Sequence, residues 1–150
     1  MSTSYKSGYG EDPDNGSEFI VREPYAAWDL STAARKISSG LPAGVLESLR
    51  AELDLTLQEL SELVAIPMRT LARRRKEKLL SAEESERAWR IGRIIDIATE
   101  MLGSSDEARK WLREPNMALG GVAPLSFMGT EPGARLVERL LFQMGHGITV

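Results

Sequence analysis

The 150-residue sequence contains no cysteine and only one histidine, His146. The absence of cysteine excludes disulfide bonds, thiolate zinc sites and a cysteine nucleophile. With a single histidine, catalysis would have to rely on carboxylates, serine, lysine or tyrosine, and most of the acids fall in helix caps or exposed helix pairs. No glycine-rich phosphate loop follows a strand, and no metal-ligand spacing occurs. We therefore expect a protein that is not an enzyme, with no catalytic residues, metal site or cofactor.

Long apolar runs are also missing. No stretch approaches the roughly 20 apolar residues of a membrane span. The first residues, MSTSYKSGYGED, lack the apolar core of a signal peptide. We therefore expect a soluble, cytoplasmic protein without a membrane partner. Residues 1–18 contain almost nothing to bury, which predicts a disordered tail.

Charge is unevenly distributed along the chain. The net charge is −3, yet the window 67–93 holds nine arginines or lysines against four glutamates, so it carries +5 and the remainder −8. An acidic protein with such a basic segment can still bind nucleic acid. The run ARRRKEK within the window could equally be a solvated basic face.

The remaining pattern is that of helices, which predicts an all-α fold. Thr56 with Glu59, and Ser81 with Glu84, fit capping boxes at the starts of two helices. The second of these opens the longest expected helix, about residues 82–102, whose apolar residues cover more than one side. Such a helix could be a core element joining two halves, a homodimer seam, or both.

The run TLQELSELVAIPMRTLARR resembles a helix-turn-helix of the Xre-like repressor type, with small Ser61 where two helices approach closely and Ala65 at the turn. The resemblance implies a DNA-binding domain over residues 19–80, whose second helix would enter a major groove. Ala65 stands where glycine is usual, Pro67 where a serine cap is usual, and Arg74 where an aliphatic residue is usual. An alternative is a helix-turn-helix that serves assembly without an operator. The expected DNA-contacting residues are Gln58, Met68, Arg69, Thr70, Arg73 and Arg74.

A second informative stretch is dense in glycine and proline. Seven of these residues fall within positions 115–133, too many to continue a helix. The same stretch is rich in apolar residues, unlike a disordered linker. A shaped apolar loop must pack on its own domain or on a partner.

Fourteen residues in and around this stretch follow a pattern known from one family: Trp111, Leu112, Pro115, Asn116, Leu119, Gly120, Gly121, Pro124, Leu125, Thr130, Glu131, Gly133, Val137 and Leu141. In their order and spacing they resemble the toxin-binding domain of the Xre/MbcA/ParS antitoxin family. The domain would occupy residues 81–150, and the wider match covers about residues 40–147.

The resemblance implies an antitoxin that inhibits a RES-domain, NAD-degrading toxin by blocking its active-site cleft. It also implies repression of the shared promoter through operator DNA, by a homodimer within a larger toxin–antitoxin complex. A stand-alone regulator, whose C-terminal domain dimerises or binds another ligand, is the alternative. His146 could also be an ordinary surface histidine at a helix end. The expected toxin-binding residues are Asn116, Gly120, Gly121, Pro124, His146, Gly147, Ile148, Thr149 and Val150.

Overall fold

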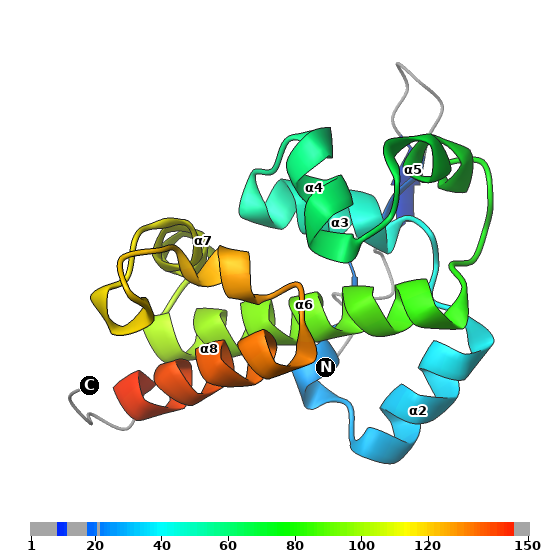
Figure 1. Cartoon of the computed structure of the whole chain (residues 1–150). Coiled ribbons are helices and arrows are strands. Elements are labelled where there is room, and N and C mark those ends of the chain that lie inside the picture. The colour runs from blue at the N-terminus through cyan, green and yellow to red at the C-terminus, as the bar shows by residue number, and fades with distance from the viewer. Residues whose placement is uncertain (1–8, 12–17, 21, 146–150) are drawn as a thin grey trace.

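A computed structural model describes residues 9–11, 18–20 and 22–145 of the chain, with side chains described from residue 22 onward. Its body is helical (Figure 1). The α-helices are α2 (Leu30–Ser39), α3 (Val45–Leu53), α4 (Leu57–Val64), α5 (Met68–Arg74), α6 (Ala82–Leu102), α7 (Ser105–Arg113) and α8 (Glu131–Gly145). Short 3₁₀ turns are η1 (Tyr25–Ala27), η2 (Met117–Leu119) and η3 (Pro124–Phe127).

The all-α class is confirmed, with one small addition near the N-terminus. Strands β1 (Tyr9–Glu11) and β2 (Glu18–Ile20) pair in antiparallel register. They place regular structure inside the segment 1–18, which was expected to be disordered. Apart from Tyr9–Glu11 and Glu18, that segment lies outside the described residues. None of the described helices is both long and apolar enough to cross a membrane.

Helix α6 is the element on which the others assemble. Figure 1 shows α3, α4 and α5 on one side of it, α2 on another, and α8 running alongside it. The predicted capping box is present: the Ser81 hydroxyl accepts from the Glu84 amide at 3.1 Å, and the Glu84 carboxylate accepts from the Ser81 amide at 2.9 Å. Gly103, at φ 100°, ends the helix in the left-handed conformation that glycine adopts most readily. Both ends of α6 are therefore set by local sequence.

The apolar residues of α6 are buried against other elements of the same chain. Ile91, Ile94, Ile95 and Ile97 are each 5% exposed or less, and Ala98 is fully buried. Their partners lie in both halves of the molecule, because α6 packs on α3 and α4 as well as on α7 and α8. Of the roles left open for this helix, the core role is confirmed. A homodimer, which stays a prediction, would have to use another face.

The segment before α2 is anchored to this core by a buried charge. Arg22 is 5% exposed and donates to Glu52 of α3 at 2.9 Å and to Asp96 of α6 at 2.8 Å. Burial alone would lower the pKa of Arg22, but its hydrogen bonds and ion pairs with the two carboxylates outweigh burial and raise it. Residues 22–29 are thus part of the folded body.

Tyr25 fixes the same segment against α6 by close packing. Its ring lies beside Gly92, where an added Cβ would stand 2.6 Å from a ring carbon. The Arg22 guanidinium also lies 5.0 Å from the centre of this ring. Glycine is therefore required at position 92 to let the N-terminal segment approach.

Candidate functional site

The turn between α4 and α5 has the geometry that the sequence predicted. Ala65 adopts φ 54°, the left-handed conformation for which glycine is better suited. The Ser61 hydroxyl donates to the Ile66 carbonyl at 2.7 Å, and Ile66 is 1% exposed. The small serine thus closes the turn while Ile66 anchors it in the core.

Helix α5 presents several of the predicted residues to solvent. Met68 is 42% exposed and Arg69 is exposed, while Thr70 is half-buried. Arg73 lies one turn after Arg69 and its side chain is 60% exposed, with Glu77 3.8 Å away. Residues four apart share one face of a helix, so Arg69 and Arg73 point the same way. Gln58 is exposed on α4 and donates to Glu62 at 2.9 Å.

Arg74 is placed differently from the other predicted residues. Its guanidinium donates twice to Glu84, from Nε at 2.8 Å and from Nη2 at 2.9 Å, and Nη1 contacts Glu77. Burial alone would raise the pKa of Glu84, but the hydrogen bonds from Arg74 and from the Ser81 amide lower it instead. Arg74 therefore faces α6 and does not join Arg69 and Arg73 on the outer face of α5.

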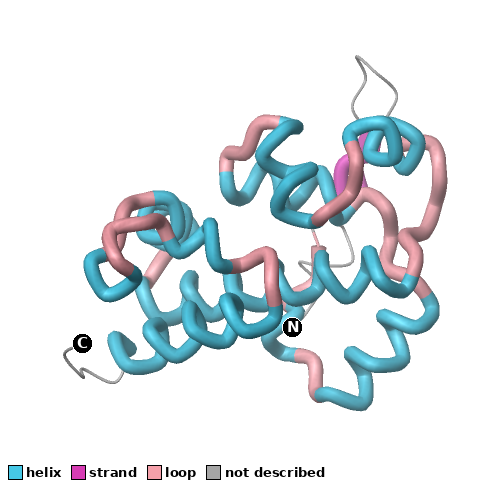
Figure 2. Tube along the Cα trace, in the orientation of Figure 1, coloured by secondary structure: helices cyan, strands magenta, loops and turns pink. Residues whose placement is uncertain are grey.

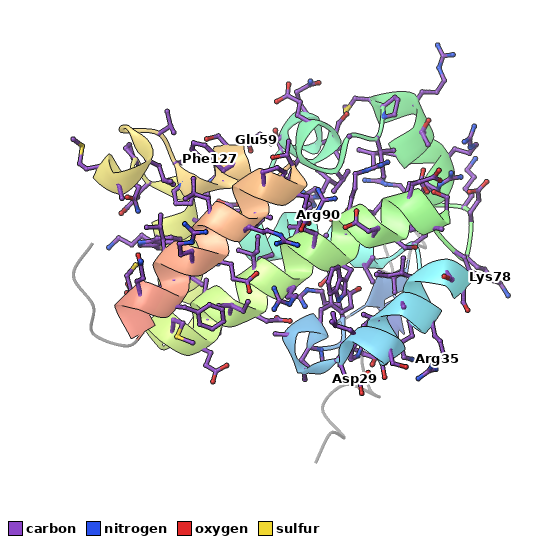
Figure 3. The ribbon with its side chains drawn as sticks, turned by 60° about the horizontal axis from the view of Figure 1, so that its bottom comes forward. Asp29, Arg35, Glu59, Lys78, Arg90 and Phe127 are labelled. Carbon is purple, nitrogen blue, oxygen red and sulfur yellow. The ribbon has the colours of Figure 1, made fainter. Side chains whose placement is uncertain are left out.

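Further cations follow directly after α5. Arg75, Lys76 and Lys78 are all exposed, and Lys78 projects from the edge of the molecule in Figure 3. Within the part of the chain that the structure describes, Arg69, Lys76 and Lys78 form no ion pair, while Arg75 lies 4.0 Å from Glu47. We call Arg69, Arg73, Arg75, Lys76 and Lys78 the basic surface. The three cations after the helix lay within the ARRRKEK run but were not predicted as contacts.

The glycine- and proline-rich stretch folds into two 3₁₀ turns joined by loops (Figure 2). Asn116 organises the first. Its side chain accepts from the Ala118 amide at 2.9 Å, and its carbonyl accepts from the amides of Leu119 at 3.0 Å and Gly121 at 2.9 Å. Its own amide donates to the Val122 carbonyl at 3.0 Å. Asn116 is half-buried, so it shapes the loop more than it covers the surface.

Two consecutive glycines allow this loop to close. Gly120 and Gly121 have φ of 79° and 87°, and an added Cβ at either would meet nothing within 4 Å. Glycine is therefore favoured at these two positions by the backbone conformation and not by a lack of space for a side chain. The turn leaves Met117 87% exposed and Val122 45% exposed. We call residues 116–122 the apolar loop. Met117 and Val122 were recognised in the sequence as apolar, but not as its exposed groups.

Buried side chains and arginines hold the stretch in place. Pro124 is buried and Leu119 is 8% exposed, while Met128 is fully buried. Arg90, which lies between α6 and α8 in Figure 3, donates to the Gly129 carbonyl at 3.2 Å. Arg113 donates to the Leu53 carbonyl at 3.1 Å and so ties the end of α7 to the end of α3. Of the predicted toxin-binding residues, Pro124 is thus an internal anchor.

The other predicted toxin-binding residues, His146, Gly147, Ile148, Thr149 and Val150, lie outside the described residues. Their role stays a prediction.

A cleft of about 410 Å³ opens between the start of α2, α6 and α8, next to Arg90 in Figure 3. None of the predicted site residues that the structure describes lines it. Among all the residues that the structure describes, no cluster of three or more His, Asp or Glu side chains could hold a metal ion. The basic surface and the apolar loop are thus separate from this cleft, whose lining is largely charged.

Comparison with known proteins assigns the two halves of the chain to two different domains. Residues 32–93 match the antitoxin Xre-like helix-turn-helix domain, and residues 98–147 match the antitoxin Xre/MbcA/ParS C-terminal toxin-binding domain. An antitoxin Xre of Photorhabdus laumondii is 31% identical over 114 residues, 75% of this chain and 77% of its own. Another antitoxin Xre, from Pseudomonas putida, is 31% identical over 125 residues, 83% of this chain and 77% of its own.

A solved structure shares the fold. A chain of the crystal structure of the M. tuberculosis MbcT–MbcA toxin–antitoxin complex superposes with a TM-score of 0.53 and 21% identity. The match covers 72% of this chain and 96% of the other. At this identity it establishes the arrangement of helices alone.

Proposed function

The chain belongs to the Xre family of antitoxins, and from this premise we propose that it inhibits a RES-domain toxin that degrades NAD. The chemistry then lies in the toxin, and this chain supplies a surface that blocks the toxin's active-site cleft. The apolar loop is the observation that carries the proposal, because Met117 is 87% exposed on a loop whose shape is fixed by its own hydrogen bonds. A rigid apolar projection suits insertion into a cleft, since little conformational entropy is lost on binding.

The predicted residues of the apolar loop and of the turn after it have distinct parts in this proposal. Asn116, Gly120 and Gly121 fix the conformation that presents Met117, and Pro124 anchors the following turn to the core. The expected contact energy therefore comes from the exposed apolar groups, while the polar and small residues determine where those groups stand.

The test is co-purification with the product of the adjacent gene, followed by measurement of NAD consumption. A tagged copy of the full chain should retain a RES-domain enzyme and silence its NAD loss. A complex that still consumes NAD at the rate of the free enzyme would contradict the blocking mechanism. Absence of any complex would contradict the choice of toxin.

Residues 146–150 are a second candidate for the blocking element. Deleting them from the full chain, then measuring NAD loss in the complex, separates the two candidates. Full inhibition by the shortened chain would assign blocking to the apolar loop. Restored NAD loss with an intact complex would assign it to the tail.

We also propose that the basic surface binds operator DNA and that the antitoxin represses its own promoter. This is supported by exposed cations on α5 and directly after it, several without an ion-pair partner among the described residues. Replacing Arg69 and Arg73 together by alanine should abolish operator binding and leave toxin binding intact. Loss of both activities would indicate misfolding. A symmetric dimer would read two half-sites roughly 34–36 Å apart.

A stand-alone regulator is the competing function, and the helix-turn-helix alone would support it. Such a protein would bind DNA normally and form no complex with the neighbouring gene product. The exposed apolar loop favours the antitoxin, because it carries two exposed apolar side chains, Met117 and Val122, and grouped exposed apolar residues mark interaction sites.

A further inference from the structure

We infer that Arg74 is a positioning residue, whose pair with Glu84 sets the orientation of helix α5 on helix α6. The inference rests on the proposed DNA binding and changes the part that Arg74 has in it. Arg74 would support the helix that contacts DNA without contacting phosphate or base itself.

Helix α5 has little of its own to fix its position. It spans only Met68–Arg74, and Pro67 at its N-cap makes no side-chain hydrogen bond. Leu71, 7% exposed, is its only buried side chain. A helix this short is marginal in isolation and depends on tertiary contacts. One buried leucine holds the helix to the core but leaves rotation about its own axis weakly determined.

The Arg74–Glu84 pair supplies the missing constraint. Two parallel hydrogen bonds, at 2.8 Å and 2.9 Å, join the guanidinium edge to the carboxylate. The side chains are 16% and 10% exposed, so solvent competes weakly for either group. A planar two-point contact fixes angle as well as distance, which a single contact does not.

Glu84, the partner of Arg74, is itself held in place. Glu84 lies in the first turn of α6 and also accepts from the Ser81 amide at 2.9 Å. Helix α6 is in turn held by the buried residues Ala88 and Ile91. The pair therefore holds the C-terminal end of helix α5 against helix α6. The N-terminal end of α5 has no side-chain cap.

Electrostatics argues against direct DNA contact by Arg74. Its guanidinium is enclosed by two carboxylates, those of Glu77 and Glu84. A phosphate approaching that site would meet a local charge of −1. Arg69 has no such carboxylate partner among the described residues, and Arg73 lies 3.8 Å from one.

Glu84→Gln provides a test whose sign separates positioning from simple charge effects. Glutamine can replace glutamate in a capping box, so the start of α6 is retained while the ionic pair is lost. Removing an acid near DNA ordinarily strengthens binding. We expect Glu84→Gln to weaken it about 10-fold, in titrations of the promoter duplex upstream of the coding sequence. Glu83→Gln, one position away and exposed, is the matched control and should bind equally or more tightly.

Salt dependence tests the same point on the arginine. A lost phosphate contact lowers the slope of log K against log salt by about 0.9. Arg73→Gln should show this decrease, whereas Arg74→Gln should weaken binding with an unchanged slope. Amide exchange of residues 71–75 should accelerate in Arg74→Gln even without DNA.

The outcomes separate the inference from the function on which it rests. If the natural chain binds the duplex but Glu84→Gln binds as tightly, or Arg74→Gln lowers the slope, the positioning role is overturned and DNA binding stands. If the natural chain does not bind the duplex, the proposed function fails. Unchanged amide exchange in Arg74→Gln would overturn the positioning role independently of DNA.

Discussion

The basic surface and the apolar loop are two exposed regions of one small molecule, and they differ in both chemistry and support. The basic surface gathers cations on and after α5, while the apolar loop exposes Met117 and Val122. Exposed cations suit a polyanion, and exposed apolar groups suit a protein cleft. The contrast indicates that one chain can serve two partners of opposite chemistry without sharing residues between them.

The two regions also differ in what holds them. The apolar loop is closed by its own hydrogen bonds, since Asn116 binds the amides of Ala118, Leu119 and Gly121. Helix α5 is held from outside, through Leu71 and the pair of Arg74 with Glu84. A change in the core should therefore affect both regions, whereas a local change should affect one.

The largest expected effect comes from the buried charge of Arg22, which joins α3 to α6. Arg22→Met would leave Glu52 and Asp96 without their shared cation and should lower the free energy of unfolding by about 3 kcal/mol. Urea denaturation monitored by circular dichroism measures the change. Arg139→Met, at an exposed arginine with no ion pair among the described residues, should change stability by less than about 0.5 kcal/mol. Equal effects for the two variants would show that the buried network adds nothing.

The next effect should separate the two regions. Met117→Asp places a charge on the apolar loop and should weaken toxin binding by at least 2 kcal/mol, roughly 30-fold, if Met117 fills a pocket on the toxin. Calorimetry of the purified partners measures it, and DNA binding should not change. Leu30→Asp, at another apolar residue that is 80% exposed, is the control and should bind toxin normally. Normal binding by Met117→Asp would move the contact away from the loop.

A smaller effect should follow from loosening the apolar loop without changing its surface. Asn116→Ala removes the hydrogen bond to the Ala118 amide and should cost about 1 kcal/mol of toxin-binding free energy. Asn116→Asp, whose carboxylate can accept the same bond, should restore most of the affinity. If alanine and aspartate weaken binding equally, the asparagine contacts the toxin directly.

The smallest expected effect concerns the turn before α5. Ala65 at φ 54° carries a strain that glycine relieves, so Ala65→Gly should stabilise the chain by about 0.5 kcal/mol after the loss of backbone entropy. Thermal unfolding measures the gain. Ala72→Gly, in the exposed middle of α5, should instead destabilise by about 1 kcal/mol. Destabilisation at both positions would mean that the turn tolerates alanine without strain.

Local rules predicted much of this molecule. The capping boxes at Thr56 and Ser81 are both present, and Ala65 adopts the unusual conformation expected at the turn. These features depend on residues within four positions of one another, so they can be read from a short stretch. The glycine pair of the apolar loop was equally recognisable for the same reason.

Long-range pairings could not be predicted in this way. The burial of Arg22 has no local signal in the sequence, because its partners Glu52 and Asp96 lie 30 and 74 residues away. The resemblance placed Arg74 among the expected DNA contacts. Its pair with Glu84, which lies 10 residues away and beyond the end of its helix, could not be read from the local pattern. The resemblance to a family predicts the partner classes, but it does not predict which arginines form buried pairs with other elements of the chain.

The pair of Arg22 with Asp96 also has a consequence for the order in which the chain is made. During synthesis, Arg22 leaves the ribosome long before Asp96, since 74 positions separate them. Until α6 has emerged, the N-terminal segment lacks both Asp96 and the Gly92 surface on which Tyr25 packs. The nascent helix-turn-helix half should therefore remain incomplete until most of the chain is available, as is usual where contacts are distant in sequence. Newly made chains would then acquire both surfaces at nearly the same moment.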